Sequence, residues 1–224
     1  MEVVAIAHIL VPTDGPNDWR QFLADPEKQW KRGYSAMAAA LSWEAAAGSL
    51  PTEIATLFAG DIELLLAIPE HKVPLPGGRR ESQCDVFALV SASNNTISLA
   101  VEAKVNEPFG PTVKEWMQNP SPGKRERISF ICEALGLEGP LPEELRYQLL
   151  HRTAAAVIEA QRFKTDRAAM VVQSFSQQHR WFEDFALFCE AMGQNTELNQ
   201  PLEVVLPSGL PLTLGWAVGS PEFL

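Results

Sequence analysis

Apolar residues along the chain follow two kinds of pattern, one predicting strands and the other helices. Apolar runs between turn residues predict strands at 1–11, 61–73, 84–90, 96–105 and 168–175, with one or two more in 202–218. Apolar residues at helical spacing predict helices at 30–48, 124–136, 141–163 and 180–193, and a short one near 50–58. This order predicts a single α/β domain, 1–224, with a central mixed sheet flanked by helices.

The segment 82–110 contains two of these apolar runs, and charged residues interrupt both. The linker SASNN between the runs predicts a β-hairpin. Asp85 lies in the first run, and Glu102 and Lys104 lie in the second. Side chains alternate between the two faces of a strand, so Glu102 and Lys104 point the same way.

The register of this hairpin decides which charge Asp85 faces. A turn at Ser93-Asn94 places Asp85 opposite Glu102, whereas a turn one residue later places it opposite Lys104. In both registers the three charged side chains share one face. The other face is wholly apolar and is expected to pack on a layer of helices.

The charged face has two interpretations. One is an exposed salt bridge between Lys104 and either acid, a common feature that contributes at most about 1 kcal/mol. The other starts from the excess of negative charge, since an unpaired carboxylate on a partly buried strand is costly. A divalent cation such as Mg²⁺, which takes oxygen ligands, removes that cost.

Asp85, followed across the hairpin by Glu102-Ala103-Lys104, resembles the D-(x)n-E-x-K signature of the PD-(D/E)xK nuclease superfamily. The predicted order of a helix, three strands, a long helix and a strand resembles the αβββαβ core of its restriction-endonuclease-like fold. At the start of the motif Cys84 stands where the nominal signature has Pro, a departure that is frequent in the superfamily.

Two longer segments are similar to an uncharacterised bacterial family within that superfamily. They are VEAKVNEPFG, which contains the E-x-K motif, and RYQLLHRTAAAVIEAQRF in the long predicted helix. The resemblance implies metal-dependent hydrolysis of phosphodiester bonds in nucleic acid. Asp85 and Glu102 would bind Mg²⁺, with Mn²⁺ as an alternative, and Lys104 would assist the attacking water.

Many members of the superfamily add an acidic ligand from the preceding core helix. Glu44 is the candidate here, because the residues before it on its side of the helix are apolar. Glu63 and Glu70 on the first hairpin-flanking strand are the competing candidates. An ordinary exposed helix acid is the other interpretation of Glu44.

The long predicted helix carries two polar pairs at i,i+4 spacing, Gln148 with Arg152 and Tyr147 with His151. In some members of the superfamily a Gln on this helix reaches the active site. The resemblance therefore implies that Gln148 is a further catalytic residue, while a solvated helix face is the alternative.

Basic residues form two local clusters, which we expect to contact phosphates of the nucleic acid. Arg79 and Arg80 lie in a Gly-rich loop before the Asp85 strand, and Lys124, Arg125 and Arg127 lie at the start of a predicted helix. Solvated loop charges are the competing interpretation. The spacing of the Gly-rich loop does not match a P-loop.

The amino-acid composition limits the kinds of partner that this protein can bind. The 28 acidic and 18 basic residues give a formal net charge of −10, which excludes a protein that coats nucleic acid through bulk electrostatics. Three scattered Cys residues without a CxxC pattern predict buried free thiols in a reducing cytoplasm and no structural zinc. We expect no membrane association, and a homodimer stays open.

Functions from two main classes fit these observations. The first is a Mg²⁺-dependent nuclease, with DNA as the expected substrate, which the intact Asp, Glu and Lys favour. The second is a non-catalytic nuclease-like domain that binds nucleic acid or protein, which the charge of −10 favours. A structural α/β protein with a chance motif is the third interpretation.

Overall fold

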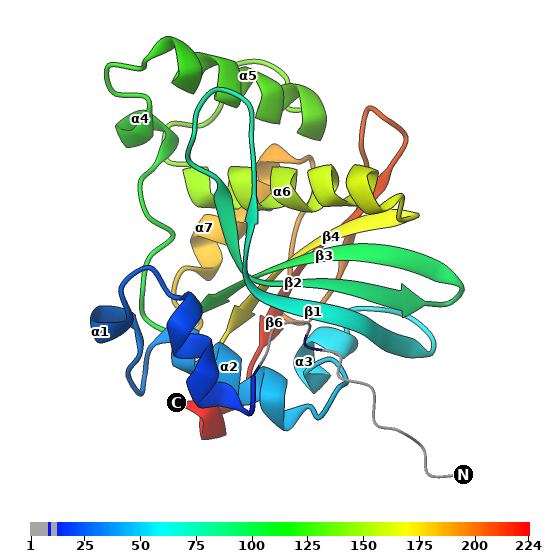
Figure 1. Cartoon of the computed structure of the whole chain (residues 1–224). Helices are drawn as coiled ribbons and strands as arrows, with labels where there is room; N and C mark the ends of the chain where they lie inside the picture. The colour runs from blue at the N-terminus through cyan, green and yellow to red at the C-terminus, as the bar shows by residue number, and fades with distance from the viewer. Residues whose placement is uncertain (1–8, 10–12) are drawn as a thin grey trace.

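A six-stranded mixed sheet forms the centre of the computed structural model, which describes residue 9 and residues 13–224 (Figure 1). The strand order is β1-β2-β3-β4-β6-β5. The strand bounds are Ile62–Val73 for β1, Ser82–Ala92 for β2, Asn95–Lys104 for β3, Arg167–Ser174 for β4, Leu202–Val205 for β5 and Pro211–Val218 for β6. The strand predicted at 1–11 lies outside the described residues except for Ile9, which forms a parallel bridge with Ala67.

The sheet combines an antiparallel meander with a parallel half. β1, β2 and β3 pair antiparallel in sequence order. β3 pairs parallel with β4, and β4 pairs parallel with β6, while β5 and β6 form an antiparallel hairpin at the edge. The prediction of an α/β fold with a central mixed sheet is therefore confirmed.

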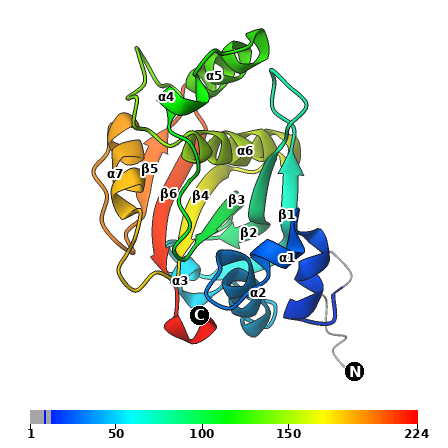
Figure 2. The same ribbon diagram turned by 90° about the vertical axis from the view of Figure 1, so that its left-hand side faces the viewer.

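Helices cover both faces of the sheet (Figure 2). On one face lie α5 (Pro122–Leu135), α6 (Tyr147–Phe163) and α7 (Phe182–Ala191), with the short α4 (Val113–Trp116). On the other lie α2 (Ser35–Ala45) and α3 (Thr52–Ala55), with α1 (Pro26–Gln29) nearby. Two short 3-10 helices, Pro16–Phe22 and Pro221–Phe223, complete the described elements.

Burial of both faces explains why the strands are so apolar. The α6 face contains Met170, Val172 and Trp216, and the α2 and α3 face contains Leu99 and Val101. A sheet that is buried on both sides needs nearly continuous apolar strands. The predicted packing of the apolar hairpin face on helices is confirmed, because Leu99 and Val101 pack in the same cluster as residues of α2 and α3.

The long helix begins later than the pattern predicted. α6 starts at Tyr147, whereas the expected start was 141. The preceding residues instead pair with the segment before α4: Arg146 forms a bridge with Thr112, and the Leu145 carbonyl accepts a hydrogen bond from Val113 N at 2.7 Å. Tertiary pairing thus outweighs local helix propensity here.

The hairpin adopts the first of the two predicted registers. Ala92 pairs with Asn95, so the turn is at Ser93-Asn94, and both turn residues have positive φ values, 49° and 66°. Positive φ at both positions is the requirement of a type I′ turn. The register therefore aligns Asp85 with Glu102.

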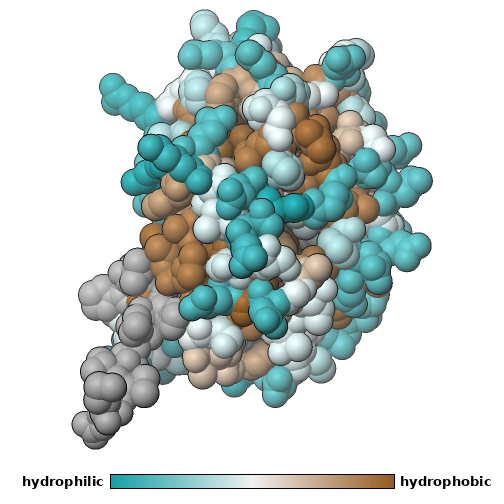
Figure 3. All heavy atoms as spheres, turned by 90° about the vertical axis from the view of Figure 1, so that its right-hand side faces the viewer, coloured by the Kyte–Doolittle hydropathy of each residue, from teal (hydrophilic) through white to brown (hydrophobic). Residues whose placement is uncertain are grey.

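No helix among residue 9 and residues 13–224 is long and apolar enough to cross a membrane. The side of the molecule opposite to the one seen in Figure 2 carries mostly polar side chains, with apolar areas, coloured brown, between them (Figure 3). The large apolar residues that are exposed include Leu65, Phe163 and Val205, which belong to three different elements.

Candidate functional site

The charged side chains of the hairpin line one pocket near the C-terminal end of β3. Its volume is about 370 Å³. It is lined by residues of α1, α2, α6 and strands β1, β2 and β3, among them Glu70, Asp85, Glu102, Lys104, Gln148 and Arg152. The structure therefore brings the three residues of the predicted motif together with two polar residues of α6.

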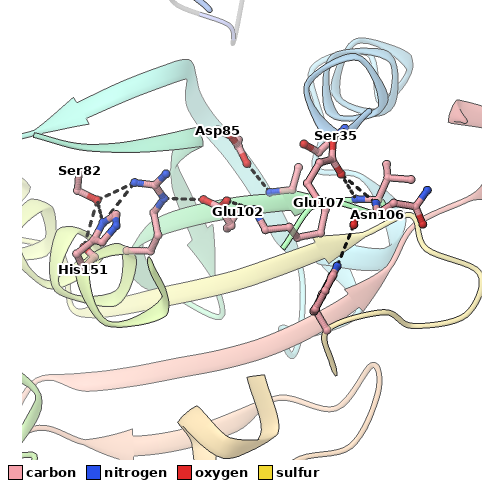
Figure 4. Close-up of polar contacts among 12 residues, drawn as sticks. Ser35, Ser82, Asp85, Glu102, Asn106, Glu107 and His151 are labelled. Carbon is pink, nitrogen blue, oxygen red and sulfur yellow. Dashed lines mark hydrogen bonds and ion pairs between the residues drawn. The ribbon is translucent and has the colours of Figure 1, made fainter. Parts of the chain in front are cut away.

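Glu102 is the centre of this cluster and is almost completely buried, with 2% of its surface exposed. Lys104, two residues later on the same face of β3, donates to its Oε1. Arg152 from α6 donates through Nε to its Oε2 at 2.5 Å (Figure 4). Both carboxylate oxygens are thus paired with cations, as a buried charge requires.

Arg152 also ties the cluster to the start of β2. Its Nη1 donates to Ser82 Oγ at 3.0 Å, and Ser82 Oγ lies 2.8 Å from His151 Nδ1 (Figure 4). Burial, together with the neighbouring Arg152, lowers the pKa of His151 to about 3, so the ring is neutral. These contacts fix the guanidinium in front of Glu102.

Asp85 lies where β2 and β3 separate. The last paired residues of the ladder are Val86 and Val101, and β3 continues without a β2 partner. Asp85 Oδ2 instead accepts a hydrogen bond from the backbone N–H of Ala103 at 2.6 Å (Figure 4). A side chain thus replaces the missing strand pair and holds the opening between the strands.

Glu70 faces Asp85 from the neighbouring strand. The flanking pairs Pro69 with Val86 and His71 with Cys84 place residues 70 and 85 opposite each other. Like charges opposite each other destabilise a sheet. Glu70 also has a φ of 53°, a strained conformation for a residue other than Gly, and such strain is concentrated at functional sites.

The electrostatics of the three carboxylates diverge. Burial, together with repulsion from Asp85, raises the pKa of Glu70 to about 8. Burial, together with Glu102, raises the pKa of Asp85 to about 7. Although burial also acts on Glu102, Arg152 and Lys104 hold its pKa at about 2. Glu70 and Asp85 therefore hold protons near neutral pH more readily than ordinary carboxyls, and a bound cation would displace those protons.

These residues could hold a hard divalent cation only if water and substrate oxygens completed its coordination shell. Among the described residues, no group of three or more His, Cys, Asp and Glu side chains is placed to hold a metal ion alone. Mg²⁺ is commonly bound by one or two carboxylates, with waters and substrate phosphate oxygens completing its shell. Asp85 and Glu70 offer two such carboxyl groups in the same pocket, so the donor set suits Mg²⁺ or Mn²⁺.

Residues 12–221 match the family described as "Domain of unknown function (DUF6946)". The chain belongs to the DUF6946 family. No curated protein and no solved structure matches it. The family description carries no activity, so the DUF6946 site has to be interpreted from its own residues.

The acid on α2 does not join the DUF6946 site. Glu44 accepts a hydrogen bond from Trp19 Nε1 at 2.7 Å and does not line the pocket. Glu63 is exposed and pairs in register with Ser91, away from the cluster. Of the three acids considered, the structure brings only Glu70 to Asp85, because the helical side that carries Glu44 faces Trp19.

The other predicted site residues of the DUF6946 chain line two different pockets, except Arg125. Gln148 lines the pocket with Asp85 and Glu102. Arg79, Arg80 and Lys124 line a second pocket on the other side of α6. Arg125 is exposed and lines neither pocket.

Arg152 lines the pocket, although the sequence pattern left it without a role of its own. Its i,i+4 spacing from Gln148 was visible, and both residues line the pocket. What the pattern did not contain is the pairing of Arg152 with Glu102, since 50 residues separate them in the chain. The sequence signal that could have revealed Arg152 is its position one helical turn after Gln148, a candidate site residue.

Proposed function

We propose that this protein is a metal-dependent nuclease, which hydrolyses phosphodiester bonds of nucleic acid at the Asp85, Glu102 and Lys104 cluster. The observation that carries the proposal is the meeting of these three residues in one pocket, where the two strands of the hairpin separate. The resemblance of the motif to PD-(D/E)xK nucleases supports the same reaction.

The element order supports a restriction-endonuclease-like core. α2 precedes the meander of β1, β2 and β3, and α6 then leads to β4, which lies parallel to β3. We propose that these six elements are the αβββαβ core of that fold. β5, β6 and α7 extend the sheet and its helical layer at the β4 side.

The chain's own groups have separate tasks in this proposal. Asp85 and Glu102, the acids of the motif, would hold the metal ion together with Glu70; such an ion would supply a water of lowered pKa and positive charge for the phosphoryl oxygens. In the reaction, the Lys104 ammonium group leaves Glu102 and contacts the attacking water instead. There it also stabilises the negative charge that develops on the phosphoryl group. Arg152 keeps Glu102 ionised, and Gln148 orients the substrate phosphate.

A non-catalytic binding domain is the second candidate, and one observation favours it. Both carboxylate oxygens of Glu102 are paired with Lys104 and Arg152, so a structural role already accounts for this acid. The same ion pairs without a metal would leave a nuclease-like scaffold that binds nucleic acid or protein. Activity separates the two candidates.

The test is a cleavage panel. Purified protein is incubated with single- and double-stranded DNA and RNA in Mg²⁺, in Mn²⁺ and in EDTA. We expect cleavage of at least one substrate with either metal, none in EDTA, and loss of cleavage in Asp85→Asn with its fold retained. Failure to cleave any substrate contradicts the nuclease and supports the binding domain.

A further inference from the structure

The second pocket lies between the β1–β2 loop, α4 and the beginning of α5 and α6. Its volume is about 480 Å³, within the range of small-molecule sites. In Figure 2, α4 and α5 lie above the beginning of α6, and α1 and α2 lie below it. The second pocket is therefore on one side of α6, and the pocket of the Asp85 cluster is on the other.

Basic side chains surround this pocket in a chain that is otherwise acidic. Arg79, Arg80 and Lys124 line it against a single acid, Glu81. Arg79 and Arg80 are exposed, and neither belongs to any ion pair formed within the described part of the chain. With a net charge of −10 for the whole protein, this local positive charge is complementary to an anion.

The loop that carries the two arginines is fixed in place. Arg127, which is buried, donates to the carbonyl oxygens of Leu75, Pro76 and Gly78 at 2.8 to 3.1 Å. The loop backbone also touches the start of α5, since a Cβ added at Gly77 would lie 2.1 Å from the Gly123 carbonyl oxygen. The basic groups therefore project from a rigid wall.

Aromatic rings also line this pocket. The Trp116 and Tyr147 rings are stacked, with centroids 3.8 Å apart, and the His151 ring lies 4.8 Å from Tyr147, tilted by 49° to it. Lys124 Nζ lies 5.1 Å from the Trp116 ring centroid. An aromatic wall beside basic groups is the combination by which proteins bind unpaired bases and their phosphates.

The first turns of α6 connect the two pockets. Tyr147 and His151 line the second pocket, and their neighbours Gln148 and Arg152 line the pocket of the Asp85 cluster. Ser82 in the second pocket accepts a hydrogen bond from Arg152, which in turn donates to Glu102. A chain that crosses the beginning of α6 reaches both pockets.

We infer that the second pocket is a nucleotide subsite, which holds an unpaired base and its phosphate while an adjacent linkage lies at the Asp85 cluster. The inference rests on the proposed function for the chemical class of the ligand. It makes the substrate single-stranded or locally unpaired nucleic acid, because base pairing would keep the base out of a pocket of this size.

Binding without catalysis tests this subsite. The affinity of the full chain for a fluorescein-labelled single-stranded octanucleotide, and for the matching duplex, is measured in EDTA by anisotropy over a range of salt concentrations. The variants are Arg79→Gln with Arg80→Gln, and Lys124→Gln. Arg125→Gln is the matched control, since Arg125 neighbours Lys124 on α5 but does not line the pocket.

We expect the single strand to bind at least about tenfold more tightly than the duplex, a difference of about 1.4 kcal/mol. The double Arg variant should weaken binding about tenfold and reduce the salt slope by about one, because phosphate contacts release counterions. Arg125→Gln should change affinity less than about twofold. A free mononucleotide should compete weakly, since it cannot span both pockets.

Equal binding of the duplex, equal loss in Arg125→Gln, a mononucleotide as good as the octanucleotide, or no binding of the single strand would each overturn the subsite. The outcome is separable from that of the nuclease proposal. Single-strand binding that depends on the pocket, without cleavage in Mg²⁺, retains the subsite and removes the nuclease. Cleavage unaffected by the loop variants does the reverse.

Discussion

Glu70 occupies an unfavourable position in the sheet. It sits opposite Asp85 with a positive φ, and nothing basic in the described residues pairs with it directly, since its partner is the neutral amide of Gln83 at 2.7 Å. A buried acid beside another acid lowers the stability of the fold unless it holds a proton or a cation. The cation proposed for this site would offset that cost.

Glu70→Gln tests that interpretation through stability. The pKa of Glu70 is raised from 4.5 to about 8, so its stabilising protonated form is present at low pH and is lost as the pH rises through about 8. In chemical denaturation without divalent ions, the variant should exceed the wild type by about 1–3 kcal/mol at pH above 8 and match it near pH 4. Saturating Mg²⁺ should remove the difference. A variant that is less stable than the wild type at high pH would contradict this reading.

Arg152 has the opposite character, because its loss leaves Glu102 buried with one partner fewer. Arg152→Met should reduce the free energy of unfolding by about 3–5 kcal/mol, as expected when one member of a buried ion pair is removed. Arg125→Met on α5 is the control, since Arg125 is exposed and belongs to no ion pair among the described residues. Adding Glu102→Gln to Arg152→Met should recover part of the loss, and full additivity of the two substitutions would contradict the pairing.

The hairpin is the element that creates the site, because its register determines which residues meet. The motif residues were predictable from alternation alone, and both candidate turns placed them on one face. The sequence did not decide between the turns, and it did not show that β2 leaves β3 beyond Val86. That separation depends on the Asp85 side chain bonding to Ala103 N, a contact across 18 residues.

The turn itself offers a test with a matched control. Asn94 has a φ of 66°, a conformation that Gly adopts without steric cost, so Asn94→Gly should raise the free energy of unfolding by up to about 1 kcal/mol. Asn95 pairs with Ala92 as a strand residue, so Asn95→Gly should lower it by about 0.5–1 kcal/mol. Thermal denaturation of both variants checks this, and the reverse order would contradict the assigned register.

Helix boundaries show the same division between local and long-range information. The stop of α5 at Gly136 was predicted from the glycine, which has the expected left-handed conformation with φ 71°. The start of α6 was wrong by several residues because Leu145 and Arg146 pair with residues 111–113 instead. The position of Glu44 outside the pocket was not predictable for a related reason, since helical periodicity does not reveal that Trp19 covers its side of α2.

At the scale of the whole molecule, acidity and function are in tension. A net charge of −10 repels nucleic acid at long range, and the basic residues beside the second pocket are a local exception. We therefore predict weak binding to duplex DNA with a shallow salt dependence, because few phosphates are contacted, and activity confined to substrates that present unpaired bases. Fold class and motif were within reach of the sequence, whereas the second pocket was not, because three separate segments of the chain form it.

The measurement that tests the central claim most directly is the single-turnover cleavage rate of Lys104→Met against that of Lys72→Met. Lys72 is an exposed residue of β1 outside both pockets. On the substrate found by the cleavage panel, Lys104→Met should lower the rate by about 10²–10⁴-fold with substrate affinity nearly unchanged, because Lys104 acts on the attacking water. Lys72→Met should cleave like the wild type. Cleavage by Lys104→Met at the wild-type rate, or no cleavage of any substrate by the wild type, would contradict the account.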